Sequence, residues 1–214
     1  MTINPEWDEL FKTRSWGKYP DLELVRFVKR TFPTGAKQVL ELGCGTGANL
    51  RMLRAELFDV YGIDGSQEAV DKCSEFMPNV VSFGDVANIR EIYDDLKFDL
   101  ICDVGCFMHQ TASDRLKIIA DCYEQLKPGG YIFFSEMVSV LCSAYDDSLE
   151  QPDDLAFVRD PHFQPKIPYH FFDEKELLEL FSIFERVELE YVTRSYNKRK
   201  RFYDRYYISG RKPA

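Results

Sequence analysis

The chain has 214 residues, a length typical of one domain carrying additional segments. Hydrophobic residues make up 45% of it, which is enough to build a core and excludes disorder as the main state. The 36 acidic residues outnumber the 27 basic ones, so the net charge is −9. A general binder of nucleic acid or of anionic membranes is therefore disfavoured, because the overall field repels phosphates.

Residues 1–21 are polar and aromatic and do not resemble an export signal, and no run of about 18 apolar residues predicts a membrane-spanning helix. The six cysteines include no Cys-x-x-Cys pair. We therefore expect reduced, buried thiols in a cytoplasmic protein, with no disulfide framework and no metal site. The cysteines are Cys44, Cys73, Cys102, Cys106, Cys122 and Cys142.

Short apolar runs alternate with segments of helical spacing through the first two thirds of the chain. Such runs are typical of strands buried on both faces, and the alternation predicts parallel crossovers. The expected strands are 39–42, 60–63, 80–83, 98–104 and 131–134, with helices at 48–57, 67–76 and 116–126. The sequence Lys-Pro-Gly-Gly at 127–130 should end the last of these helices.

The C-terminal part departs from this alternation. A helix is expected at 174–181, followed by two runs, 184–193 and 202–209, in which apolar and polar residues alternate across a short turn. They predict a hairpin, so one terminal strand should be antiparallel. The fold class is therefore α/β: a Rossmann-like, doubly wound, mostly parallel seven-stranded sheet. The basic cluster from Arg194 to Arg201 should be a solvated hairpin tip, with local nucleic-acid binding as the alternative.

Glycine and carboxylate residues follow three successive predicted strands. Glu41-Leu42-Gly43-Cys44-Gly45-Thr46-Gly47 joins the first strand to the first helix, and its glycines allow a tight turn and close approach of a ligand. Asp64 ends the second strand, where a carboxylate can accept both hydroxyl protons of a ribose. Asp85 follows the third strand, placed to accept from an exocyclic amine of a base. Together these features predict a nucleoside site.

The order of these motifs resembles that of class I S-adenosylmethionine-dependent methyltransferases of the small-molecule type. The resemblance covers about residues 36–136. The motifs that carry it are 39–47, Ile63-Asp64, Gly84-Asp85, 98–101 and Leu126-Lys127-Pro128-Gly129-Gly130. The terminal hairpin also fits the seven-stranded sheet of that family. The resemblance implies S-adenosylmethionine as methyl donor and S-adenosylhomocysteine as product.

The resemblance also implies a donor-binding set. Glu41 would order the glycine loop and the amino group, and Asp64 would hold the ribose hydroxyls. Asp85 would lie at the adenine edge, and Asp103 beside the methionine end. The whole set is Glu41, Gly43, Cys44, Gly45, Asp64, Gly65, Ser66, Asp85, Val86 and Asp103, and Trp16 would cover the donor.

The resemblance divides a predicted single domain, 1–214, into four parts. They are an N-terminal helical cover (1–36, with a helix from about 21 to 31), the cofactor-binding core (37–136), a substrate-covering insert (137–171), and the helix and hairpin (172–214). Long connections in a compact domain are often lids or binding loops.

The candidate catalytic base is His109, directly beyond the fourth strand. The structural alternative is a histidine that caps the next helix or orders the loop. His162 and His170 are expected to be packing or loop residues, whereas Tyr145 and Tyr169 could line an acceptor pocket. No Asn-Pro-Pro-Tyr or Asp-Pro-Pro-Tyr run follows the fourth strand, so a small acceptor methylated at oxygen or nitrogen is favoured.

Two other functions stay open. An oxidoreductase with a nicotinamide cofactor would use a Gly-x-Gly-x-x-Gly turn, but here the third glycine comes one position early and Glu41 would repel a pyrophosphate. A non-catalytic cofactor-binding scaffold is the other. The sequence predicts no oligomeric state.

Overall fold

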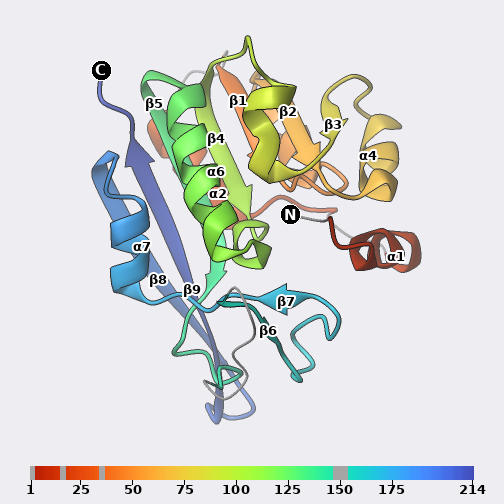
Figure 1. The fold of residues 1–214 in the computed structure, drawn as a ribbon, viewed down its shortest axis with the longest axis vertical. Coiled ribbons are helices and arrows are strands. Elements are labelled where there is room, and N and C mark those ends of the chain that lie inside the picture. Colours follow the sequence, from red (N-terminus) through yellow and green to blue (C-terminus); the bar gives the residue numbers. More distant parts are fainter. Residues whose placement is uncertain (1–2, 15–17, 34–36, 147–153) are drawn as a thin grey trace.

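The computed structural model describes residues 3–14, 18–33, 37–146 and 154–214. Within them a seven-stranded sheet has the strand order β3-β2-β1-β4-β5-β9-β8 (Figure 1). The strands are β1 Gln38–Leu42, β2 Asp59–Asp64, β3 Val81–Phe83, β4 Phe98–Val104, β5 Leu126–Val138, β8 Glu185–Tyr196 and β9 Arg201–Arg211. The first five pair in parallel, and β9 is antiparallel to both β5 and β8. The predicted fold class, including the antiparallel terminal hairpin, is confirmed.

Helices cover both faces of this sheet. One hydrophobic core joins α2, α3 and α4 to one face, and the other joins α5, α6 and α7 to the opposite face. Neighbouring residues of β1 belong to different cores, Val39 to the first and Leu40 to the second, which is why the strands read as continuous apolar runs. The helices are α1 Glu6–Thr13, α2 Leu22–Thr31, α3 Ala48–Ala55, α4 Gln67–Ser74, α5 Ile89–Ile92, α6 Ala112–Gln125 and α7 Glu174–Leu180, with 3₁₀ turns η1 Val86–Asn88 and η2 Phe107–His109. In the described part of the chain, none of the helices has the length and apolar character needed to span a membrane.

The start of the fifth strand was predicted wrongly. β5 begins at Leu126, where α6 ends, because Leu126 already pairs with Phe98 of β4. The register then shifts before Tyr131 pairs with Leu100. The Lys-Pro-Gly-Gly sequence does end the helix, and its four residues form an irregular stretch of β5 without partners on β4. Gly129 has a φ of +75°, which a glycine adopts without strain.

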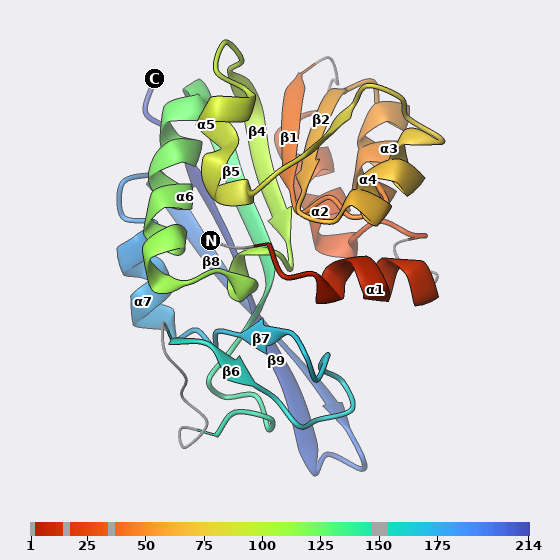
Figure 2. The same cartoon turned by 45° about the vertical axis from the view of Figure 1, so that its right-hand side comes forward.

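Two elements that the sequence analysis did not predict lie where the parallel strands point (Figure 2): α1, and the two-stranded pair β6 Ala156–Phe157 and β7 Pro168–Tyr169. Ser66, before α4, donates to Asp8 of α1 over 2.5 Å. At the start of α1, Glu6 pairs with Lys166 of the insert over 3.0 Å. α1 therefore connects the turn after β2 to the insert.

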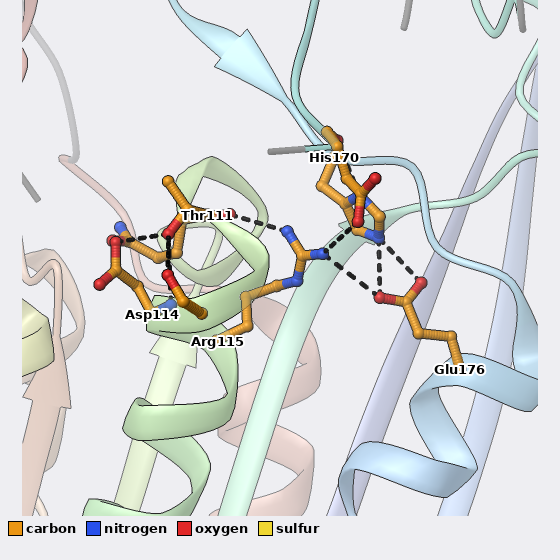
Figure 3. A network of polar contacts seen from close by, with 8 residues as sticks. Thr111, Asp114, Arg115, His170 and Glu176 are labelled. Carbon is orange, nitrogen blue, oxygen red and sulfur yellow. Dashed lines mark hydrogen bonds and ion pairs between the residues drawn. The ribbon is translucent and has the colours of Figure 1, made fainter. Parts of the chain in front are cut away.

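A buried arginine fastens the second half of the insert to the rest of the fold (Figure 3). Arg115, on α6, donates to the carbonyl of Gln110 over 2.8 Å and lies 3.5 Å from Glu176 of α7. His170 contacts the same Glu176 carboxylate through Nε2 at 2.8 Å and the Asp154 carbonyl through Nδ1 at 2.9 Å. This network joins α6, α7 and residues 154–170.

We expect Arg115→Met to lower the free energy of unfolding by about 2 kcal/mol, because a buried, charge-assisted set of hydrogen bonds is lost while the aliphatic stem is kept. Urea denaturation measures the change. The matched control is Arg26→Met, because Arg26 is exposed and pairs only with Glu23 on its own helix. That pair should contribute about 0.5 kcal/mol or less. Equal losses for the two variants would contradict a docking role for Arg115.

Candidate functional site

A cavity of about 720 Å³ lies at the carboxyl ends of the strands. Its walls come from the glycine loop after β1, from the ends of β2, β4 and β5, from α1 and from the insert. Its size is in the range usual for cofactor and small-molecule sites, and the ends of parallel strands are where open α/β sheets bind their ligands.

The glycine loop needs its glycines for conformation and for space. Gly43, Gly45 and Gly47 have φ values of +61°, +53° and +80°, a region that L-residues adopt at a cost. A Cβ on Gly43 would also lie 2.4 Å from the Cβ of Cys106, in the segment after β4. The loop is therefore packed directly against the next part of the cavity wall.

Asp64 fixes the glycine loop to the turn after β2. Its Oδ2 accepts the Gly45 N–H over 2.7 Å, and its Oδ1 accepts the Ser66 N–H over 2.8 Å. Burial raises the pKa of Asp64 to about 6, although these two hydrogen bonds favour the charged form. Each carboxylate oxygen can accept a further hydrogen bond from a ligand, since a carboxylate offers about four lone-pair sites.

Glu41 lines the cavity and carries an oxygen that has no hydrogen-bond partner among the described residues. Its Oε1 accepts from Asn49 over 2.6 Å, while Oε2 is buried and has no partner. Asn49 in turn accepts the backbone N–H of Asp21 over 2.8 Å, which ties the start of α2 to this carboxylate. Burial raises the pKa of Glu41 to about 8. A buried, unpartnered carboxylate oxygen favours a ligand that brings an N–H donor or a positive charge.

His109 lines the same cavity and is 5% exposed. Its Nδ1 is 2.8 Å from the Pro168 carbonyl, which can only accept, so Nδ1 carries the proton and Nε2 keeps a lone pair. The ring packs edge-on to Trp7 of α1 and to Tyr169 of β7. Burial lowers the pKa of His109 to about 4, so the imidazole is neutral at physiological pH.

The structure brings most of the predicted site residues together. The cavity is lined by Glu41, Gly43, Cys44, Gly45, Asp64, Gly65, Asp85, Val86 and His109. Ser66 and Asp103 do not line it. Ser66 caps α4, and Asp103 is buried with a pKa raised to about 7 by burial while it accepts the Cys106 N–H over 3.1 Å. Both therefore shape the loops behind the cavity wall. Trp16 lies outside the described residues.

Several lining residues had not been identified from the sequence. Trp7 and Phe11 enter from α1, Gln110 from the end of the turn η2, and Glu136 from the end of β5. Gln110 follows His109 directly, so its place beyond the fourth strand was a usable signal. His162, expected to be a packing or loop residue, lines the cavity and packs on Tyr196. Of the two tyrosines considered for an acceptor pocket, Tyr169 lines it, and Tyr145 is not among the lining residues.

All six cysteines are free, and five of them are buried; Cys106 is half-buried. In the described ranges, no group of three His, Cys, Asp or Glu side chains is arranged to hold a metal ion.

We expect Gly43→Ala to be more destabilising than Gly105→Ala. Both residues have positive φ, so both variants should lose about 1–2 kcal/mol through backbone strain. At Gly105 the new Cβ would meet its nearest neighbour at 3.6 Å, an ordinary contact, so only Gly43→Ala adds a clash, with Cys106. Urea denaturation of the two variants measures the difference. Equal losses would show that the loop and Cys106 move apart easily.

The matches to curated proteins cover only part of each of those proteins. Glycine/sarcosine N-methyltransferase of Aphanothece halophytica is 31% identical over 143 residues, which cover 61% of this chain and 51% of that protein. Polyamine aminopropyltransferase of Shigella dysenteriae is 34% identical over 105 residues, covering 47% of this chain and 33% of that protein. The chain thus spans between a third and slightly over half the length of these curated relatives.

Solved structures share the fold over most of the chain. An S-adenosylmethionine-dependent methyltransferase of Methanosarcina mazei superposes with a TM-score of 0.64 at 20% identity, covering 83% of this chain and 93% of its own. The N-methyltransferase NodS of Bradyrhizobium japonicum, solved with S-adenosylhomocysteine, gives 0.66 at 15% identity and full coverage of both chains.

The family model described as a methyltransferase domain matches residues 16–193, well over half of the chain. The protein therefore belongs to the methyltransferase-domain family.

Proposed function

We propose that this protein transfers the methyl group of S-adenosylmethionine to a small-molecule acceptor, at oxygen or nitrogen. The observation that carries the proposal is that Glu41, Asp64 and Asp85, from the ends of three neighbouring strands, line one cavity together with a glycine loop. The family membership supports the reaction class, and glycine/sarcosine N-methyltransferase supports a small acceptor by its name.

The residues present fit the donor. Glu41 Oε2, buried and unpartnered, suits the α-ammonium group, and the spare lone pairs of Asp64 suit the ribose hydroxyls. Gly43, Cys44 and Gly45 would lie along the methionine part, with Gly65, Asp85 and Val86 around the adenine. An acidic wall favours a sulfonium compound without phosphates over a dinucleotide, whose pyrophosphate would meet Glu41 and Asp64. The donor supplies a methyl group made electrophilic by the positive sulfur.

The protein's part in the chemistry is alignment, exclusion of water and disposal of a proton. His109 is the proposed proton acceptor, because Nε2 has a lone pair and the ring is held by the Pro168 carbonyl, Trp7 and Tyr169. α1 and the insert would keep water away from the acceptor. We further propose a cytoplasmic location, which the six free thiols support.

We expect S-adenosylhomocysteine to bind and Asp64→Asn to weaken binding about tenfold or more, since a ribose hydroxyl then loses its charged partner. Isothermal titration calorimetry measures both. The matched control is Asp59→Asn, at the other, exposed end of β2, with affinity unchanged. NADH titrated under the same conditions should give no heat. The donor assignment fails if S-adenosylhomocysteine does not bind at millimolar concentration, or if NADH binds in its place.

The affinity for S-adenosylmethionine should rise between pH 6 and pH 8. In the free protein burial raises the pKa of Glu41 to about 8, so much of it is protonated in this range. A bound ammonium group favours the carboxylate and lowers that pKa, so binding releases a proton and strengthens as the pH rises. We expect about a tenfold gain over the interval, read by calorimetry in buffers of different ionisation enthalpy.

The control for this experiment is Glu41→Gln, which cannot titrate. The ligand's own amino group titrates equally in both proteins, so the difference between them belongs to Glu41. The variant should bind more weakly at pH 8, and its affinity should change less with pH than that of the wild type. Parallel pH profiles for the two proteins would contradict contact between Glu41 and the ammonium group.

A further inference from the structure

Resting on the methyl-transfer function proposed above, we propose that the acceptor is an amine, and that Glu136 and Gln110 hold its N–H groups. Both residues line the cavity, Glu136 from β5 and Gln110 from the end of the 3₁₀ turn η2 that follows β4. Three independent features of the structure lead to this substrate class.

The first feature is the charge of the cavity wall. Five carboxylates line it, and none of the lining residues within the described ranges is a lysine or an arginine. The segments outside those ranges contain no lysine or arginine either. An acceptor bearing a carboxylate or a phosphate would therefore enter without a counter-charge, whereas an amine meets complementary groups. The five are Asp21, Glu41, Asp64, Asp85 and Glu136.

The second feature is the backbone that presents Glu136. Between Phe134 and Met137 the pairing of β5 with β9 shifts by one residue, which is a β-bulge. Glu136 within it has a φ of +61°, a strained conformation for a residue with a side chain. Such strain persists where surrounding contacts enforce it, and it concentrates at binding sites. A Cβ on Gly105, across the strand pair, would lie 3.6 Å from the Cβ of Glu136, so Gly105 leaves the space beside it open.

The hydrogen bonds that Glu136 accepts converge on one of its two carboxylate oxygens. Arg205 and Tyr207, both on β9, donate to the same oxygen, Oε1, the tyrosine over 3.0 Å. Arg205 is 5% exposed and does not line the cavity, so it fixes the carboxylate from behind. Both donors address one oxygen, which leaves Oε2 as the acceptor for a ligand. Asp21 adds a second carboxylate near this arginine, so the group as a whole keeps a negative charge.

The third feature is an unsatisfied oxygen. Gln110 is 6% exposed, and its Oε1 is buried without any hydrogen-bond partner. Its Nε2 lies 3.4 Å from the Cys106 carbonyl, which assigns the nitrogen, and the residue lines the cavity. A buried amide oxygen without a donor is costly, and a ligand N–H removes that cost. An amine supplies several such donors at one atom.

The reaction balances for an amine without a strong base. The bound ammonium group first releases one proton to water; the neutral nitrogen then uses its lone pair to bond the methyl carbon, while the carbon–sulfur bond breaks with its electron pair returning to sulfur. The product ammonium then loses one proton, to Nε2 of His109 or to water, and Glu136 stabilises the positive charge until it does. A hydroxyl acceptor would instead need its proton removed during the attack, and His109 is a weak base because burial lowers its pKa to about 4.

The test separates amines from hydroxyl compounds by chemistry, without knowing the metabolite. The small-molecule fraction of a cell extract is divided, and one half is treated with acetic anhydride in neutral water, which acylates amines and leaves most hydroxyls. Both halves are incubated with the protein and S-adenosylmethionine labelled on the methyl group. We expect labelled product only from the untreated half, resolved by chromatography from the labelled donor, which is itself a cation. Equal labelling of both halves would overturn the amine assignment.

Two variants locate the binding groups. Glu136→Gln keeps an oxygen for Arg205 and Tyr207 but turns Oε2 into a donor, so labelling at limiting extract should fall about tenfold or more. Gln110→Met removes an oxygen that no other group contacts and should lower labelling less. The control is Glu185→Gln, on β8, paired with Arg211 away from the cavity, with labelling unchanged.

The binding of S-adenosylhomocysteine, measured on the same samples, distinguishes the two levels of the proposal. It should stay within about twofold of the wild type in the Glu136 and Gln110 variants. Binding without any labelled product from the untreated extract would overturn the amine assignment and leave the donor site standing. If the wild-type protein does not bind S-adenosylhomocysteine, the methyl-transfer function itself is overturned. Full labelling by both variants would remove Glu136 and Gln110 from the acceptor site.

Discussion

The carboxylate of Asp64 determines the shape of the cavity wall, because it joins two loops that would otherwise be independent. Each of its oxygens accepts one backbone N–H, from Gly45 on one side and Ser66 on the other. Ser66 then donates to Asp8, so the same chain of contacts positions α1 above the site. One buried carboxylate thus positions the glycine loop, the turn after β2 and α1. A neutral side chain at position 64 would release all three.

The buried carboxylates also make the empty site unfavourable. Burial raises the pKa values of Glu41, Asp64 and Asp103 to about 8, 6 and 7, above those of the unfolded chain. Because the folded state holds these protons more tightly than the unfolded chain does, the free energy of unfolding falls as the pH rises from about 4 through these pKa values. His109 acts in the opposite direction: its pKa of about 4 removes stability as the pH falls below about 6.5. A cationic ligand compensates the acids, so the site is arranged for a partner that brings positive charge.

The sequence predicted the elements that depend on local pattern. The carboxylates at strand ends could be found because each follows a short apolar run, and parallel strands end at one edge of the sheet. The features that were missed depend on contacts between distant residues. Asn49 joins β1 to the start of α2, and the positive φ of Glu136 is enforced by pairing with β9, about seventy residues later. The start of β5 was missed because Lys-Pro-Gly-Gly favours a turn locally, whereas Leu126, which precedes it, already pairs with Phe98 of β4.

The two segments that cover the site, α1 and the insert, are held to the rest of the fold by different kinds of contact. α1 is joined to α4 by Asp8, which accepts from both Ser66 and the Glu68 N–H. Its ion pair with the insert, Glu6 with Lys166, is exposed and contributes little, but Trp7 and Leu10 also pack against the apolar core that contains Ile167 and Tyr169. The insert itself is anchored at its far end by Arg115, which is buried. Apolar packing therefore holds α1 to the insert more than its exposed ion pair does, and the buried Arg115 network holds the other end of the insert.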